Sequence, residues 1–191
     1  MSYQIINNLP SDFIFSDKSN SELKHYEEWF KTNKEKRIKQ LIEAIKESKG
    51  FENWKADFTP SSLNEIGSWI KQNLYTEKIS TEKYKQKRLS IPDYINIRDW
   101  DLTNETYSKL IDIGIYFGEV FIKNHTNLKW EQFFSKIKND SDHGHMVIKG
   151  FGKDRLNPLR VSYIIGLKMI DNKSNETGIF KAYTTWKSYL S

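Results

Sequence analysis

The chain has 191 residues, of which 30 are Lys or Arg, 25 are Asp or Glu, four are His and none is Cys. Without Cys there can be no disulfide, thiolate nucleophile or Cys-ligated metal. No stretch approaches the 18 or so consecutive apolar residues of a membrane span, and the opening MSYQIINNLP lacks the basic-then-apolar order of a secretory signal. We therefore expect a soluble, cytoplasmic protein that binds no membrane and needs no cofactor.

The net charge of +5 raises the question of nucleic-acid binding. Lys supplies 25 of the 30 cations, whereas phosphate and base recognition favours the bidentate guanidinium of Arg. Many Lys lie beside Glu, as in the run 34–36, which is typical of a solvated helix face. The densest basic run is 78–88, and it is offset by Glu77 and Glu82. Weak nucleic-acid binding through residues 78–88 is an alternative that this pattern disfavours.

In domain organisation, the sequence predicts a short N-terminal arm followed by one globular domain. Residues 1–18 are expected to be extended, because Pro10 and its polar neighbours interrupt any helical period. Residues 19–191 show no internal repeat or low-complexity linker, and 14% of the chain is aromatic. A domain of this size can bury roughly 70% of its unfolded surface.

The first half of that domain is predicted to be helical. Apolar residues recur every three or four positions from Ser19 to Ile45, which predicts one helix or a pair divided near Asn33, with Gly50 as the stop. Thr59-Pro60 has the form of an N-cap followed by proline, and Ser62-x-x-Glu65 offers an overlapping capping box for a second helix. Residues 75–101 lack a period and read as a long connection containing one short helix.

The most apolar segment follows Thr103, which can cap it, and it is predicted to be the central helix. At 100° per residue its polar side chains fall in one narrow stripe. The stripe consists of Asp112, Tyr116, Glu119 and Lys123. Gly114 and Gly118 lie on the apolar side, where each costs roughly 1 kcal/mol of helix stability against Ala. We therefore expect another element to pack very close to the backbone there.

The second half of the domain is predicted to contain the strands. Segments 129–134 and 145–151 are short and rich in aromatic and branched residues, which favours a small antiparallel sheet, although 130–137 also fits a short helix. Asn157-Pro158 opens a segment that reads most simply as a helix, with a strand as the alternative. Aromatic residues recur at helical spacing in 179–190. The predicted fold class is α+β, a mainly helical single domain with a small antiparallel sheet in the C-terminal half.

His143-Gly144-His145 is the one metal-like cluster in the sequence. On a strand, residues two apart point the same way, so both imidazoles could reach one ion together with a carboxylate such as Asp142. Two His in a loop beside Asp and Gly also fit an exposed turn, and this second interpretation is favoured. His143 and His145 are thus candidate metal ligands only.

The stripe on the central helix supplies the candidate catalytic residues Glu119, Asp112 and Tyr116. In one interpretation Glu119 and Lys123 form a solvent-facing pair one turn apart. In the other the stripe faces a cleft, where Glu119 could act as a general base or anchor a buried network. Asp112 and Glu119 lie roughly 10.5 Å apart along the axis, which is wide for a catalytic pair and favours a network. The nucleophile-elbow pattern Gly-x-Ser-x-Gly is absent.

A set of motifs resembles small bacterial immunity-type proteins found beside polymorphic toxins. The motifs are the run 57–63 (DFTPSSL), Trp69, the run 114–119 (GIYFGE) and Trp130, within residues 54–165. The resemblance implies a cytoplasmic α+β domain in which Gly118, Glu119 and Trp130 are structural positions. A net charge of +5 departs from the acidic character of immunity proteins that bind nucleases, which speaks against a basic nuclease as partner.

The function favoured by the sequence is therefore a non-enzymatic protein-binding module, with an immunity-like role as its specific form. The aromatic residues are available as interface anchors, and the binding candidates are Tyr116, Lys123 and Trp130. A hydrolase-type enzyme that uses a carboxylate of the central helix is the alternative.

Overall fold

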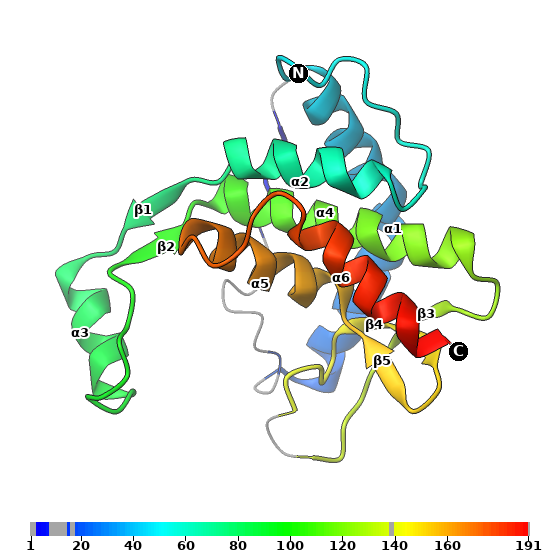
Figure 1. The fold of residues 1–191 in the computed structure, drawn as a ribbon. Coiled ribbons are helices and arrows are strands. Elements are labelled where there is room, and N and C mark those ends of the chain that lie inside the picture. Colours follow the sequence, from blue (N-terminus) through cyan, green and yellow to red (C-terminus); the bar gives the residue numbers. More distant parts are fainter. Residues whose placement is uncertain (1–2, 8–14, 16–17, 138–139, 191) are drawn as a thin grey trace.

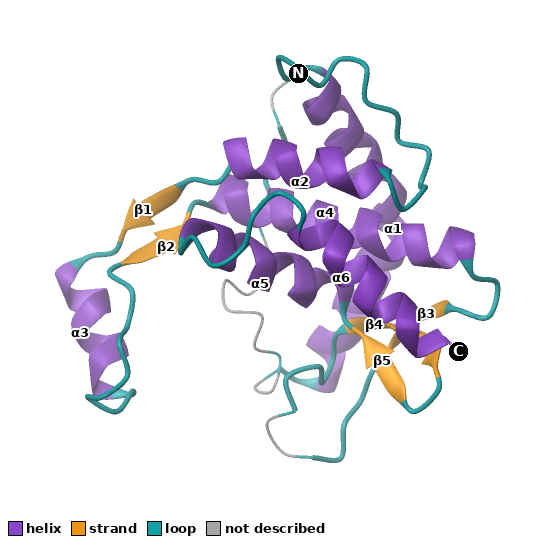
Figure 2. Cartoon of the chain, in the orientation of Figure 1, coloured by secondary structure: helices purple, strands orange, loops and turns teal. Residues whose placement is uncertain are grey.

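The computed structural model describes residues 3–7, 15, 18–137 and 140–190. Its helices are α1 (Asn20–Lys46), α2 (Ser62–Gln72), α3 (Thr81–Leu89), α4 (Asn104–Asn124), α5 (Pro158–Ile170) and α6 (Gly178–Lys187), followed by the short 3-10 helix η1 (Ser188–Leu190). Its strands are β1 (Thr76–Lys78), β2 (Trp100–Leu102), β3 (Lys129–Gln132), β4 (Met146–Phe151) and β5 (Asp154–Leu156). Figure 2 distinguishes the helices from the two small sheets. The α+β fold class is confirmed.

Helix α4 forms the centre of the molecule, and α1, α2, α5 and α6 pack around it (Figure 1). Thr103 caps α4 as predicted, because its side chain accepts a hydrogen bond from the backbone of Thr106. Every residue from Thr106 to Phe121 is buried. A helix that is apolar around most of its circumference has this position in a globular core.

The two glycines of α4 mark the predicted close approaches. A Cβ atom at Gly114 would lie 2.6 Å from the Cα of Leu159 in α5. One at Gly118 would lie 2.1 Å from Cζ2 of Trp130 in β3. Both distances are below any real Cβ contact, so these glycines allow α5 and the sheet to reach the α4 backbone.

Helix α1 is one continuous helix, which decides between the two alternatives left open by the sequence. Ser19 and Glu22 form a reciprocal capping box at its start. At Asn33 the helix continues, with the side-chain amide donating to the carbonyl of Trp29 at 2.9 Å. The helix ends at Lys46, before Gly50, whose φ is +90°.

The capping prediction for α2 was wrong in detail. The helix begins at Ser62, and Ser61 occupies the cap position without a side-chain hydrogen bond. The Ser62 hydroxyl donates to the carbonyl of Thr59 at 2.7 Å instead of forming a box with Glu65. Thr59 is itself held by Asp57, whose carboxylate accepts from the Thr59 backbone and hydroxyl.

Residues 75–102 form an arm that projects from the body (Figure 1). Strands β1 and β2 pair antiparallel, with Thr76 opposite Leu102, and α3 lies between them with no buried residue. The short helix was predicted, but the ladder at the root of the arm was missed. Strand β1 of this ladder lies outside the C-terminal half, to which the sequence analysis had confined the strands.

The second sheet has the order β3-β4-β5, and both of its pairings are antiparallel. Strands β3 and β4 were predicted, so the alternative of a helix over 130–137 was wrong, whereas β5 was missed. Asn157 caps α5 by accepting from the backbone of Arg160, as the cap-plus-proline pattern predicted. Among the described residues, no helix is long and apolar enough to cross a membrane.

The extended N-terminal segment predicted over residues 1–18 lies largely outside the described residues. Residues 3–7, which are described, contain no helix or strand. The division into residues 1–18 and 19–191 stays a prediction.

Candidate functional site

The polar stripe of α4 faces α1 and the loop before α2, and Asp112 lies fully buried in it. Its carboxylate receives two hydrogen bonds from Arg37, at 2.7 Å from Nε and 2.8 Å from Nη2. The hydroxyl of Tyr3, in the N-terminal segment, also donates to this carboxylate. The same Arg37 donates to the carbonyl of Gln4 at 2.7 Å. Asp112 thus fastens both α1 and the N-terminal segment to the central helix.

Burial changes the titration of this cluster. Removal from water raises the pKa of Asp112 from 3.8 to about 6, against the opposing effects of the Arg37 charge and the Tyr3 hydroxyl. Burial and the neighbouring Asp112 also raise the pKa of Tyr3 above its ordinary value. Both oxygens of the carboxylate are bonded to the protein and the side chain is fully buried, so a substrate in solvent cannot reach Asp112.

Glu119 is 7% exposed, and the interpretation that it faces solvent as the partner of Lys123 is wrong. Its Oε1 atom accepts from Nζ of Lys34 at 2.6 Å and from the indole of Trp130 at 2.8 Å. The Lys123 ammonium instead lies 3.4 Å from the centre of the Phe58 ring. Glu119 therefore joins α1 and β3 to the central helix.

Tyr116 is fully buried and is bonded within the chain. Its hydroxyl accepts from the backbone N–H of Phe58 at 3.2 Å and shares a hydrogen bond with the Ser62 hydroxyl at 2.9 Å. Its ring stacks on Phe58, with ring centres 4.7 Å apart. Burial raises the pKa of Tyr116. The binding candidates Tyr116, Lys123 and Trp130 thus all contact other parts of this chain.

A groove of about 750 Å³ lies between residues 4–7 and α1, and Tyr26, Trp29 and Arg37 are among the residues that line it. None of Asp112, Tyr116 and Glu119 lines that groove. The candidate catalytic residues therefore lie along one buried stripe of α4, outside this groove.

His143 lies in a turn and His145 directly before β4, which begins at Met146, so the strand geometry assumed for them was wrong. The favoured interpretation of an exposed turn was also wrong for His145, which is fully buried. Nδ1 of His143 accepts from the backbone of Ser135 at 3.1 Å, and its ring lies edge-on to Phe134. The ring of His145 packs against the ring of Phe15, with the ring centres 4.2 Å apart. Within the described ranges, no three His, Asp or Glu side chains are grouped so that they could hold a metal ion.

Lys109 is another buried charged residue of α4, and the sequence analysis did not single it out. Its ammonium lies 2.7 Å from Glu105 and 3.4 Å from the side-chain oxygen of Asn73. The rings of Tyr3, Trp69 and Tyr75 surround it at 5.6 to 5.9 Å. The sequence signal was a Lys within an otherwise apolar helical segment.

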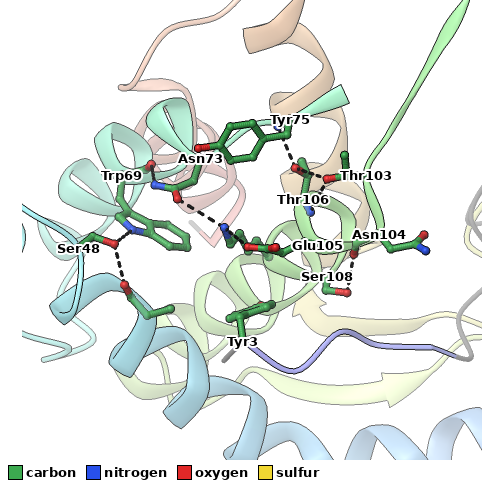
Figure 3. A network of polar contacts seen from close by, with 12 residues as sticks. Tyr3, Ser48, Trp69, Asn73, Tyr75, Thr103, Asn104, Glu105, Thr106 and Ser108 are labelled. Atoms are coloured by element: carbon green, nitrogen blue, oxygen red, sulfur yellow. Dashed lines mark hydrogen bonds and ion pairs between the residues drawn. The ribbon is translucent and has the colours of Figure 1, made fainter. Parts of the chain in front are cut away.

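Figure 3 shows how this network reaches the root of the arm. Trp69 comes from α2, Asn73 is the residue that follows α2, Glu105 comes from α4, and Tyr75 is the residue before β1. The backbone of Tyr75 donates to the Thr106 hydroxyl at 2.9 Å, and its carbonyl accepts from Thr103 at 3.1 Å. The root is therefore fixed to the first turn of α4.

Three cations of the arm, Lys83, Lys87 and Arg88, are bound within the arm. Lys83 and Lys87 lie 2.7 Å and 2.6 Å from the carboxylate of Asp101. Partial burial opposes ionisation of this carboxylate, but the two ammonium groups hold the pKa of Asp101 below its usual value. The carboxylate of Asp101 in β2 thus offsets part of the charge of the two lysines of α3.

Arg88 organises the tip of the arm, which we define as residues 89–95. Its guanidinium donates to the carbonyls of Ile91 at 2.8 Å, Pro92 at 2.5 Å and Ile95 at 2.8 Å. Three backbone oxygens on one planar group fix the loop in a single shape. The same loop exposes large apolar side chains, with Leu89 at 89%, Tyr94 at 86% and Ile95 at 44%.

No family model, curated protein or solved structure matches this chain. Its function is therefore inferred from the geometry of the central helix and the arm.

Proposed function

We propose that this protein is a non-enzymatic protein-binding module that contacts its partner through the tip of the arm. The observation that carries the proposal is that the loop 89–95 is held by hydrogen bonds while its large apolar side chains are exposed to solvent. Arg88 holds the loop by three carbonyls, yet Leu89 and Tyr94 remain almost fully exposed. Large exposed apolar side chains on a hydrogen-bonded loop are typical of a binding surface, and preordering lowers the entropy lost on association.

The polar stripe of α4 supports binding over the alternative of hydrolysis. A general base must lie within reach of the substrate. Asp112 is fully buried and bonded to Arg37 and Tyr3, and Glu119 is 7% exposed and bonded through Oε1 to Lys34 and Trp130. These carboxylates join elements of the fold, which is a structural role.

The arm also supports a protein partner over nucleic acid. Lys83 and Lys87 share Asp101, and Arg88 is bonded to carbonyls of its own loop. Neutralising phosphates would require these groups to leave their partners. The exposed groups that remain at the tip are mainly apolar.

An immunity-like role, in which the partner is a toxin, is the specific form of this function that the sequence motifs suggest. The motif residues Glu119 and Trp130 bond to each other inside the fold. In this form they maintain the domain, while the arm makes the contact.

The test compares variants of the full chain. Affinity-tagged wild type, the double variant Leu89→Lys with Tyr94→Lys, and Tyr189→Lys are each purified from the source organism. Tyr189 is a matched control because it is also an exposed tyrosine, at 51%, but lies in η1, outside the arm. We expect one protein to be retained by the wild type and by Tyr189→Lys, and lost with the double variant. Equal retention by all three variants, or by none, would contradict the proposal.

A further inference from the structure

We infer that the ion pair between Arg98 and Asp171 is a latch that sets the direction in which the arm leaves the body. Arg98 lies in the arm, two residues before β2, and Asp171 directly follows α5. The inference goes beyond the proposed function and does not rest on it, because it concerns the position of the arm, whatever the tip contacts.

The arm has little other support against the body. Its root is anchored by the hydrogen bonds of Tyr75 and by the packing of Leu102 against the core. Among the described residues, the contact between Arg98 and Asp171, at 2.5 Å, is the one ion pair or hydrogen bond that joins residues 76–101 to the body. No residue of α3 is buried, and the arm extends away from the body (Figure 1). A ladder of two three-residue strands is marginally stable by itself, so the root alone leaves the direction of the arm weakly fixed.

Asp171 occupies a position that does not favour an anion. It is the residue that ends α5, where the partial charge of the helix dipole is negative. The hydrogen bond and the charge of Arg98 hold the pKa of Asp171 below its usual value, and Lys173, at 3.9 Å, adds a smaller effect. The carboxylate therefore serves to bind the arm, since an acceptor cannot satisfy the carbonyl groups at the end of a helix.

The latch acts at the base of the arm, where a small change moves the tip furthest. The guanidinium of Arg98 also lies over the ring of Trp100, 4.9 Å from its centre, and Trp100 pairs with Lys78 at the outer end of the root ladder. Arg98 thus connects this end of the ladder to the end of α5. The ion pairs of α3 with Asp101 hold the arm together, so release of the latch would swing the tip with the rest of the arm.

The latch is also able to open. The side chains of Arg98 and Asp171 are 41% and 23% exposed, and exposed ion pairs contribute little free energy and are screened by salt. The latched and released states therefore differ by a small free energy, which the binding of a partner or a change in ionic strength can overcome. For a tip that contacts a partner, the latch determines where that contact is presented.

The test measures the distance between the arm and the body in the full chain by pulsed electron paramagnetic resonance. The chain has no Cys, so spin labels attach only at two introduced cysteines, Lys85→Cys in α3 and Lys181→Cys in α6, both at exposed positions. We expect one narrow distance distribution for this labelled parent, and a broader distribution with a shifted mean after Arg98→Gln. Lys173→Gln is the matched control, because it removes the other cation near Asp171 and should leave the distribution narrow.

Two further measurements separate the ion pair from an effect of substitution on folding. The charge reversal Arg98→Asp with Asp171→Arg should restore the narrow distribution, because it rebuilds the attraction. A salt concentration of ~1 M, at which the Debye length is about 3 Å, should broaden the distribution of the parent.

The inference is overturned if the distribution of Arg98→Gln is as narrow as that of the parent, or if the parent is already as broad at low salt. It is also overturned if the charge reversal stays as broad as Arg98→Gln. If one of these results is found while the tip retains a partner, the inference fails and the proposed function stands.

Discussion

At the scale of single residues, the polar stripe of α4 holds the fold together. Asp112 and Glu119 lie on the same helix and each binds a cation from α1, Arg37 in one case and Lys34 in the other. Removing one partner of such a buried ion pair is costly, because the other charge stays in the protein interior without a counter-charge. The stripe that resembled a catalytic face in the sequence is thus the seam between two helices.

Replacement of Arg37 by Met should expose this dependence. The variant leaves the Asp112 carboxylate buried without its cation, which should lower the free energy of unfolding by about 3 kcal/mol. Urea denaturation at neutral pH measures the change, with Lys31→Met as the control because Lys31 forms an exposed pair with Glu27. A loss for Arg37→Met no larger than that of the control would contradict the structural role.

The raised pKa of Asp112 predicts a pH dependence with a definite sign. Its pKa is about 6 in the folded protein against 3.8 as the reference. Between these values the folded state binds more protons at this site, so the stability that Asp112 contributes falls as the pH rises. The unfolding free energy of the wild type minus that of Asp112→Asn should therefore decrease from pH 4 to pH 6. An increase in this value over the same range would show that the charge of Arg37 outweighs burial.

At the scale of elements, two features determine the arrangement of the chain. One is the close packing of α4 against α5, and the other is the fixed conformation of the loop at the tip of the arm. The first depends on the missing side chain of Gly114, and the second on the guanidinium of Arg88. Each can be tested by one substitution.

Replacement of Gly114 by Ala should destabilise the protein although Ala favours helices. The new Cβ would lie 2.6 Å from the backbone of Leu159, which cannot move aside as a side chain can. We expect a net loss of about 2 kcal/mol, since overpacking of this kind exceeds the gain in helix propensity. Thermal unfolding gives the value, and an unchanged or higher melting temperature would contradict the close approach.

Replacement of Arg88 by Gln should loosen the tip without unfolding the body. Amide hydrogen exchange of residues 89–95 should become faster, because three carbonyls lose their common donor, while exchange in α4 should not change. Lys85→Gln, on the same helix, is the control. Unchanged exchange at the tip of the Arg88 variant would show that the loop is held by other means.

The sequence predicted those elements whose signals are local. Thr103 and Asn157 cap the helices that they were expected to cap, since the cap and the first helical turn are adjacent in the chain. The β1–β2 ladder was missed because it pairs Thr76 with Leu102 across α3, and three-residue strands leave no pattern. For Glu119 the sequence offered only the neighbouring Lys123, whereas its cation, Lys34, is 85 positions away.

At the scale of the whole molecule, the arm and the body differ in how their charges are used rather than in net charge, since residues 75–102 carry +1 of the total of +5. The body is stabilised by buried ion pairs and by packing around α4. The arm instead combines internal neutralisation with exposed apolar side chains at its tip. This division separates the part that maintains the fold from the part that is available for contact.

The most direct test of the central claim places a photo-activatable phenylalanine analogue at position 94 in the full chain and irradiates it in the source organism. The aromatic analogue preserves the ring of Tyr94, and the same substitution at Tyr189 is the control. We predict a discrete covalent adduct with one protein from position 94 and none from position 189. No adduct from position 94, or the same adducts from both positions, would contradict the assignment of the tip as the binding surface.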